Sequence, residues 1–471
     1  MAGKILLINT NRMRPRIAPI GLEYLASALI AAGAEVSWFD LALEGKGGPA
    51  RLKELLRKFS PDLIGITIRN IDDCYFLSGQ SFLGPIQWLV QWLKRNSRAK
   101  IVLGGVGYSV APKSLLEYLG TDYGIWGDGE EAVVKLLKAI APGKEPKPEK
   151  IPGLLIPGAK NFCRAETDPD RLFRKRKLAD NALYFRVGGQ IGIETKRGCD
   201  ARCIYCADPL AKGRTIRLRS PEAVAEEIEE LLSYGAYAFH LCDSEFNRPY
   251  SHAARVLEEI CRRNLGKKIH LYGYCSPIPF DLELAKLYAK AGGKGICFGA
   301  DSGSEQMLAI LKRDHSGRDL EKTLSACRRA GIKVMYDLLL GGPGETRKSL
   351  AKTIRLMRKL KPDRVGISYG IRVYAGTELE GIAEKQGILG KMKDNPELIF
   401  PVFYLSPEIK KGGLAYLRNL VGDDPRFFLP AAAAKKQNYN YSGNLFLEKL
   451  IKNGARGAYW HILLNAAEFE R

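Results

Sequence analysis

The first 140 residues alternate short apolar runs with longer segments in which apolar positions recur at helical spacing. The short runs predict strands, and the longer segments predict amphipathic helices. The predicted strands are Lys4–Asn9, Glu35–Asp40, Leu63–Thr67, Lys100–Leu103 and Tyr123–Trp126. The predicted helices are Gly21–Ala32, Ala50–Phe59, Gln87–Asn96, Lys113–Leu119 and Gly129–Ala139. This alternation indicates an α/β domain over residues 1–140, a parallel sheet covered on both faces.

Small and polar residues gather where these strands end. Ligands of open parallel sheets bind outside the carboxyl ends of the strands, and glycines there let the backbone approach a large ligand closely. The candidate binding residues at these ends are Thr67, Asn70, Gly104, Gly105, Gly127, Gly129 and Glu130. The alternative is a flavodoxin-like domain without a cofactor.

The second half of the chain repeats the alternation with longer helices. Residues 141–189 contain several helix-breaking prolines and are predicted to be a linker. Residues 190–380 contain six predicted strands and indicate a partial barrel, with its chemistry at the carboxyl ends of the strands. These strands are Gln190–Thr195, Ala238–Cys242, Ile269–Tyr274, Gly295–Phe298, Lys333–Leu339 and Arg364–Ser368. Residues 381–471 lack this rhythm and are predicted to form a small, mostly helical cap.

Aromatic residues are frequent in the predicted cap. They are expected in its core or, as an alternative, in the wall of a substrate pocket over the barrel mouth. They are Phe400, Phe403, Tyr404, Phe427, Phe428, Tyr439, Tyr441, Tyr459 and Trp460.

Three cysteines follow the first predicted strand of the barrel. Cys199, Cys203 and Cys206 have the spacing CxxxCxxC. A [4Fe–4S] cluster normally takes four cysteine ligands, so a loop that supplies three leaves one iron open to a substrate. The alternative is a zinc site, which is usually closed by four ligands. The chain has no second CxxC pair, and only Cys242, Cys275 or His240 could complete such a site.

Composition changes the picture in two ways. The net charge of +21 indicates an anionic partner or, equally, solvated basic surfaces. Ten cysteines in 471 residues do not form a disulfide scaffold, and a reducing compartment suits an iron–sulfur cluster. We find neither a signal peptide nor an apolar run long enough to span a membrane, so we expect a cytoplasmic protein.

The cysteine triad resembles that of the radical S-adenosylmethionine superfamily, with Tyr205 at the aromatic position usual in that loop. The resemblance implies a [4Fe–4S] cluster whose open iron binds S-adenosylmethionine. It also implies that Asp243 contacts the ammonium group of this ligand, and that Ser302 and Gly341 lie in the segments that contact its ribose and adenine. Glu245 could share the role of Asp243 or bind the open iron itself, which would favour polar over radical chemistry.

The amino-terminal pattern resembles the cobalamin-binding domain that precedes many radical S-adenosylmethionine cores. The matching segments are Pro19–Ala26, the V-L-G-G turn at 102–105 and the W-G-D-G-E segment at 126–130. The chain lacks the D-x-H-x-x-G motif whose histidine ligates cobalt, since its first histidine is His240. Arg69 is the candidate for the lower face of cobalamin. The segment Ile68–Asp73 resembles that of the tryptophan C-methylating branch, which has an arginine in that place.

These resemblances predict a cobalamin-dependent radical S-adenosylmethionine enzyme. The leading prediction is a methyltransferase that moves a methyl group from S-adenosylmethionine, through methylcobalamin, to a carbon of a small-molecule or peptide substrate. An external electron donor, a flavodoxin or ferredoxin, is expected. One alternative is an enzyme with the same cofactors that cyclises or rearranges its substrate. Another is an RNA-modifying enzyme, which the basic charge permits but the cysteine pattern does not favour.

Overall fold

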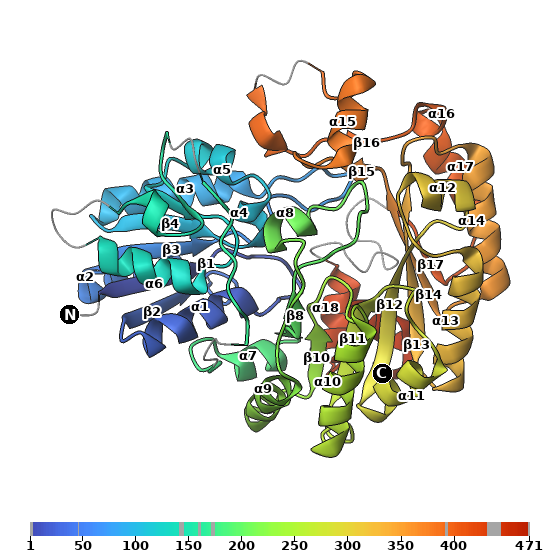
Figure 1. The fold of residues 1–471 in the computed structure, drawn as a ribbon, viewed down its shortest axis with the longest axis horizontal. Helices are drawn as coiled ribbons and strands as arrows, with labels where there is room; N and C mark the ends of the chain where they lie inside the picture. Colours follow the sequence, from blue (N-terminus) through green and yellow to red (C-terminus); the bar gives the residue numbers. More distant parts are fainter. Residues whose placement is uncertain are drawn as a thin grey trace.

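The computed structural model describes residues 3–45, 47–140, 146–158, 162–170, 175–390, 394–430 and 444–469. Two sheets lie side by side, the first in blue and cyan and the second in green, yellow and orange (Figure 1). Both sheets are built mainly from parallel strands. The predicted α/β fold, with two successive α/β domains, is therefore confirmed.

The amino-terminal sheet has the strand order β2-β1-β3-β4-β5-β6. Five strands are parallel, and β6 runs antiparallel to β5. Their register places Thr67 between Asn9 and Gly104 at the carboxyl edge. The strands are β1 Lys4–Asn9, β2 Glu35–Asp40, β3 Leu63–Thr67, β4 Lys100–Gly104, β5 Tyr123–Ile125 and β6 Leu154–Leu155.

Helices cover both faces of this sheet, and each face has its own apolar core. The core under α1 and α6 includes Leu22 and Leu136. The opposite core, under α2, α3 and α5, includes Leu52, Val90 and Leu115. The helices are α1 Ile20–Ala31, α2 Gly48–Phe59, α3 Leu83–Asn96, α4 Val106–Ser109, α5 Pro112–Leu119 and α6 Glu130–Ala139. Burial of apolar residues on both faces explains why the strands read as continuous apolar runs.

The second sheet has the order β17-β14-β13-β12-β11-β10-β7 and is parallel throughout. Six of its strands are the predicted ones: β7 Ile191–Ile193, β10 Ala238–Leu241, β11 His270–Cys275, β12 Gly293–Asp301, β13 Lys333–Leu340 and β14 Arg364–Tyr369. The helices that cover it are α9 Pro221–Ser233, α10 Tyr250–Arg262, α11 Leu282–Lys290, α12 Glu305–Ile310, α13 Gly317–Arg329 and α14 Arg347–Leu360.

The carboxyl-terminal region differs from the predicted cap in part. It is mostly helical, but its Phe427 and Phe428 form β17, which pairs with β14 and extends the barrel sheet. Trp460 packs beside Gly295 of β12, in the core of the barrel. Its elements are β15 Ile371–Arg372, α15 Glu378–Lys385, β16 Phe403–Tyr404, α16 Pro407–Lys410, α17 Gly413–Val421, β17 Phe427–Phe428, α18 Leu445–Lys452 and α19 Tyr459–Leu464.

Two further results bear on the predictions. The segment predicted as a linker contributes β6 to the first sheet, because Leu154 and Leu155 are buried against β5. The aromatic residues Tyr439 and Tyr441 lie outside the described residues. Within the described ranges, no helix has the length and apolar character needed to cross a membrane.

Candidate functional site

The loop that carries the three cysteines leaves the first strand of the barrel. After β7 the chain forms β8 (Lys196–Arg197), which pairs antiparallel with β9 (Arg217–Leu218). Gly198 has a φ of +88°, and a Cβ at this position would lie 2.1 Å from the carbonyl oxygen of Thr215. Glycine is therefore needed at the turn that leads into Cys199.

The three thiols fit an iron–sulfur cluster. Cys199 is buried, and Cys203 and Cys206 are half-buried. Burial raises the pKa of all three thiols, so each needs a cation to stabilise its thiolate, and iron supplies one. Among the described residues, no three His, Cys, Asp or Glu side chains surround a point where a single ion could bind. In a cube each cysteine holds a different iron, so the thiols need not meet at one point.

Arg313 joins the triad to two carboxylates. Its Nη1 donates to Sγ of Cys203 at 2.9 Å, and its Nη2 donates to Oε1 of Glu245 at 3.2 Å. Its Nε lies 3.2 Å from Oδ2 of Asp301, which also accepts from the hydroxyl of Tyr205 at 2.5 Å. Because one guanidinium contacts both Cys203 and Glu245, the carboxylate of Glu245 lies close to the triad. Tyr205 and Glu245 are thus brought to the cysteine loop, as the sequence predicts.

Asp243 lies beside the cysteine strand, but its carboxylate is already engaged. Oδ1 accepts from the backbone N–H groups of Thr195 and Lys196 at 2.9 and 3.1 Å. Oδ2 accepts from the hydroxyl of Thr195 at 2.6 Å. Asp243 therefore fixes the strand that leads to the cysteines, and its predicted contact with an ammonium group stays a prediction.

Ser302 and Gly341 also lie at carboxyl ends of barrel strands, as predicted. The hydroxyl of Ser302 is fully buried and hydrogen-bonds with that of Thr353 at 3.0 Å. Gly341 has a φ of +100°, and a Cβ there would lie 2.6 Å from the side chain of Leu405. Both residues shape the barrel mouth, and their contacts with S-adenosylmethionine stay predictions.

The predicted cobalamin-binding residues share one edge of the amino-terminal sheet. At Gly104 a Cβ would meet no atom within 4 Å, so the backbone faces open space, as a bulky ligand requires. Gly105 has a φ of +100°, and a Cβ there would lie 2.6 Å from the carbonyl oxygen of Ile68. Thr67 and Asn70 flank this turn on β3 and its loop. The edge therefore fits a large, flat cofactor.

Two residues of the W-G-D-G-E segment make contacts within the protein, and their predicted contacts with a cofactor stay predictions. A Cβ at Gly127 would lie 2.3 Å from the carbonyl oxygen of Ala165, so this glycine serves chain packing. The carboxylate of Glu130 accepts two hydrogen bonds from Arg197, at 2.5 and 3.1 Å. Gly129 precedes α6 with little nearby, since a Cβ there would meet only Val133 at 3.9 Å.

Arg69 lies between the two domains. Its side chain is exposed, yet burial by the surrounding protein lowers the pKa of Arg69. A side chain that is both accessible and desolvated lines an enclosed hollow. Nη1 donates to Oδ1 of Asn70 at 2.7 Å. The other titratable groups that act on its charge are Cys242, Tyr459, Cys74 and Tyr274, three of them from the barrel half.

Arg313 and Arg197, the partner of Glu130, are two residues of the site that were not predicted. Arg313 follows the short helix α12, and the L-K-R-D-H segment gives no sign that its side chain reaches a cysteine 110 residues away. Arg197 stands two residues before Cys199, which could have marked it as a residue that positions the loop. In both contacts, Arg313 with Cys203 and Arg197 with Glu130, the two residues lie far apart in the sequence.

Comparisons with known proteins agree with this geometry. Residues 193–357 match the model of the radical SAM superfamily, and residues 7–137 match that of the B12 binding domain. Tryptophan 2-C-methyltransferase from Streptomyces laurentii is 29% identical over 97% of this chain and 95% of its own length.

Two solved structures of the radical S-adenosylmethionine methyltransferase TsrM from Kitasatospora setae cover nearly the whole chain. One, with tryptophan substrate and an S-adenosylmethionine analogue bound, is 31% identical, with a TM-score of 0.91 over 99% of this chain and 98% of that one. The other, with cobalamin and a [4Fe–4S] cluster bound, is 29% identical, with a TM-score of 0.88 over 100% and 98%.

The predicted cofactors are therefore confirmed: a [4Fe–4S] cluster, S-adenosylmethionine and cobalamin. The zinc alternative and the flavodoxin-like alternative without a cofactor are both wrong. The leading prediction of a methyltransferase is confirmed over the cyclase and RNA-modifying alternatives. The chain belongs to the family of cobalamin-dependent radical S-adenosylmethionine C-methyltransferases.

Proposed function

We propose that this enzyme transfers a methyl group to C2 of the indole ring of tryptophan or of a closely related indole amino acid. The observation that carries this proposal is the full-length likeness to TsrM, whose structure contains tryptophan as substrate. The tryptophan 2-C-methyltransferase of Streptomyces laurentii supports the same carbon as the acceptor. The substrate is a small molecule, in keeping with an enclosed site between two domains.

Cys199, Cys203 and Cys206 are proposed to hold the cluster, and Glu245 to hold the fourth iron. The role of Glu245 is supported by its shared contact with Arg313, whose guanidinium also donates to Sγ of Cys203. One of its oxygens, Oε1, accepts from Arg313 at 3.2 Å, while Oε2 lies 3.9 Å from Arg248, which is beyond hydrogen-bonding distance. Oε2 is thus placed to bind a metal, and a carboxylate on the fourth iron would block chelation of S-adenosylmethionine.

With the fourth iron blocked, the expected route is polar. The sulfur–methyl bond breaks with its electron pair left on sulfur, and the indole carbon supplies the pair for the new carbon–carbon bond. The proton on that carbon then leaves. When bound, cobalamin supplies the relay between the methyl donor and the acceptor. No 5′-deoxyadenosine forms on this route.

Arg69 is proposed to lie at the lower face of cobalamin. A guanidinium cannot ligate cobalt, because it stays protonated, and its positive charge disfavours a water ligand there. The desolvated position of Arg69 supports the role, because charge acts more strongly where water is excluded. When cobalamin is bound, an arginine in place of a lower ligand would favour release of an alkyl group as a cation.

The barrel side of the hollow supports binding of an amino-acid substrate. Tyr274 is 45% exposed although it belongs to strand β11 inside the barrel, and its strand pairs with β12, where Tyr274 lies opposite Cys297. Cys297 donates to Oδ2 of Asp337 at 3.0 Å. Asp337 is proposed to attract the substrate ammonium group, because a carboxylate in an apolar barrel interior favours a cation beside it.

An external flavodoxin or ferredoxin is proposed as the reductant that would activate the corrinoid, since the polar transfer itself consumes no electrons. A cytoplasmic location stays a prediction. The proposed reaction is tested by anaerobic reconstitution with iron, sulfide and cobalamin, followed by incubation with S-adenosylmethionine, L-tryptophan and a reductant. Liquid chromatography with mass spectrometry should find tryptophan with one added methyl group and no 5′-deoxyadenosine. The 2-methyl derivative of tryptophan, blocked at the acceptor carbon, is the control and should not react.

Other outcomes of this experiment would contradict either the proposed route or the proposed substrate. Methylated tryptophan with a stoichiometric amount of 5′-deoxyadenosine would support the radical route and contradict the role of Glu245. Turnover of other indoles without turnover of tryptophan would contradict the proposed substrate. Glu245→Gln should then separate the two routes, because it removes the charged ligand while the cysteines remain.

A further inference from the structure

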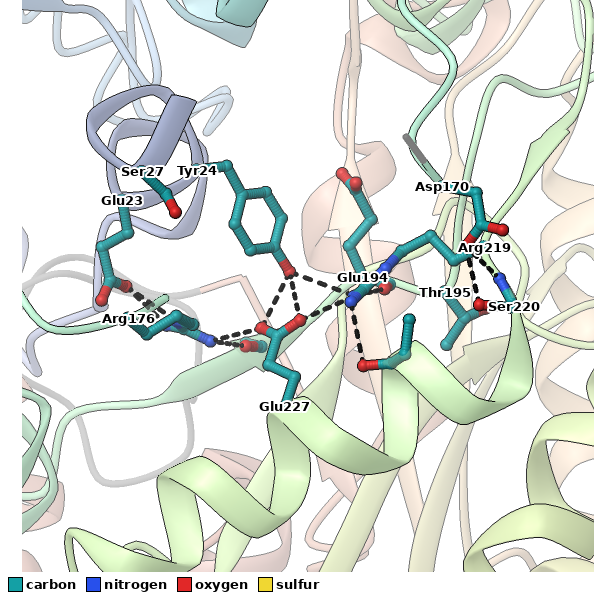
Figure 2. A network of polar contacts seen from close by, with 12 residues as sticks. Glu23, Tyr24, Ser27, Asp170, Arg176, Glu194, Thr195, Arg219, Ser220 and Glu227 are labelled. Carbon is teal, nitrogen blue, oxygen red and sulfur yellow. Dashed lines mark hydrogen bonds and ion pairs between the residues drawn. The ribbon is translucent and has the colours of Figure 1, made fainter. Parts of the chain in front are cut away.

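Buried charges join the cobalamin-binding domain to the strand that leads to the cysteines. Arg176, from the segment between the domains, is fully buried (Figure 2). Its Nη2 donates to Oε2 of Glu23 on α1 at 2.5 Å, and its Nη1 donates to the carbonyl oxygen of Gly192 on β7 at 2.6 Å. Nη1 also donates to Oε1 of Glu227 on α9 at 3.1 Å. One guanidinium thus contacts both domains and the cysteine strand itself.

A second buried arginine continues this network. Arg219 lies 2.7 Å from Oε2 of Glu227 and also donates to the carbonyl oxygen of Glu194, at the end of the same strand. Tyr24, on α1 next to Glu23, donates to Glu227 at 2.9 Å. Two arginines and two glutamates therefore balance each other's charge beside the cysteine strand. Figure 2 shows the contacts that join Arg176, Glu227 and Arg219.

A second cluster lies at the other end of the cysteine strand. Arg197 is 7% exposed and stands two residues before Cys199, and Glu130, at the start of α6 in the cobalamin-binding domain, is 3% exposed. Arg197 reaches both oxygens of Glu130, at 2.5 and 3.1 Å, and lies 3.3 Å from Asp128. Its Nε donates to Glu194 at 2.9 Å. Because Glu194 directly follows β7, this cluster also contacts the cysteine strand.

Buried ion pairs add little net stability compared with apolar residues of the same size, but they fix geometry where a misplaced charge is costly. These two clusters bracket the segment 192–197, and each ties it to the domain that binds cobalamin. We propose that Glu23–Arg176 and Glu130–Arg197 are positioning pairs, which set the distance and orientation between the cluster on the cysteine loop and the cobalamin. The two cofactors would then work at one fixed separation.

This proposal rests on the assignment of the cluster to the three cysteines. Its test compares Glu130→Gln, Glu23→Gln and the matched control Glu259→Gln in the reconstituted full-length enzyme. Glu259 is also a paired carboxylate, held by Arg262 and Arg263 on α10, but it contacts neither domain junction nor cysteine strand. Three quantities are measured: iron and corrinoid content, kcat and KM, and the magnetic coupling between Co(II) cobalamin and the reduced cluster by pulsed electron paramagnetic resonance.

We expect Glu130→Gln and Glu23→Gln to keep both cofactors and the KM for S-adenosylmethionine. Their kcat should fall about 10- to 100-fold, the effect of displacing reacting groups by about 1 Å, and the distribution of cobalt–cluster couplings should broaden. Glu259→Gln should match the wild type in all three readouts. If Glu130→Gln fails to fold, Glu23→Gln carries the same comparison.

Two results would overturn the proposal. One is wild-type kcat and wild-type coupling in both junction variants. The other is a fall in kcat that simply follows loss of cofactor, with unchanged coupling in the molecules that keep it. Absence of iron from the wild-type enzyme would instead contradict the cluster assignment, before any variant is compared.

Discussion

Nη1 of Arg313 lies 2.9 Å from Sγ of Cys203, although 110 residues separate them in sequence. The same guanidinium contacts Glu245 and Asp301. One arginine thereby fixes both the cysteine loop from β7 and the carboxylate that follows β10. The cluster site is therefore built by three βα units together.

Substitution Arg313→Gln should weaken the cluster site. It removes the positive charge that faces Cys203 and leaves Glu245 and Asp301 without their common partner. Loss of such an outer contact typically lowers metal affinity about 10- to 100-fold. Iron and sulfide analysis after passage over a chelating column measures the effect. The exposed Arg318, changed to Gln, is the control; equal iron retention in the two variants would contradict the role of Arg313.

Substitution Arg69→Ala should lower methyl transfer while both cofactors stay bound. Arg69 is held by Asn70 in the hollow between the domains, and removal of one preorganised charge typically costs about 100-fold in rate. Turnover and the visible spectrum of the corrinoid are measured together. Arg95→Ala, which changes an exposed arginine on α3, should leave both unchanged. Unaltered turnover in Arg69→Ala would rule out its proposed position.

The network in Figure 2 predicts a large loss of stability for Arg176→Met. This change leaves Glu23 and Glu227 buried beside an apolar side chain, and breaking a buried ion pair typically costs about 3–5 kcal/mol. Chemical denaturation followed by circular dichroism measures the free energy of unfolding. Arg262→Met, which breaks the ion pair with Glu259 on the surface of α10, is the matched control and should lower stability only slightly, because an ion pair with an exposed arginine contributes little. Similar losses of stability in the two variants would show that the buried ion pairs of Arg176 contribute no more than those of a surface arginine.

Glu345 predicts a pH dependence of stability. It is fully buried, and burial raises the pKa of Glu345 to about 7, whereas its usual value in an unfolded chain is about 4.3. Because the folded state holds the proton more tightly, the contribution of Glu345 to stability is complete below about pH 4 and is lost as the pH rises through about 7. Glu345→Gln imitates the neutral form.

Glu345→Gln should therefore raise the free energy of unfolding at pH 8 by up to about 3 kcal/mol and have little effect at pH 4 to 5. Its side chain can accept from the N–H of Gly341 and donate to Ser349, so the local contacts can persist. Thermal unfolding at the two pH values provides the measurement. A stabilisation that is equal at both would show that protonation of Glu345 is not the cause.

The strands and the cysteine loop could be predicted because their signals are local. All five strands predicted for the first domain and all six predicted for the barrel appear in the structure, with ends shifted by a few residues. Apolar runs are enough to predict such strands, and the CxxxCxxC spacing can be recognised in the sequence without knowledge of the fold. β17 was missed because its two phenylalanines carry no periodicity, and only pairing with β14 makes them a strand.

The contacts that assemble the site were less predictable. Glu130 is predicted as a cofactor residue from its position after a strand, yet its carboxylate binds Arg197 in the other domain. Asp243 is predicted as a ligand contact, and the structure shows that its carboxylate also accepts hydrogen bonds from Thr195. A sequence shows that a carboxylate lies at a strand end, but the partner that reaches it comes from a remote segment.

Iron, sulfide and corrinoid analysis of the anaerobically reconstituted wild type and of Cys203→Ala shows whether one chain holds a cobalamin and a cluster on separate domains, with the cluster bound by the three cysteines. We expect iron and corrinoid together in the wild type, and loss of iron with corrinoid retained in Cys203→Ala. Unchanged iron in Cys203→Ala, or a wild type that holds zinc in place of iron, would show that the three cysteines do not bind an iron–sulfur cluster.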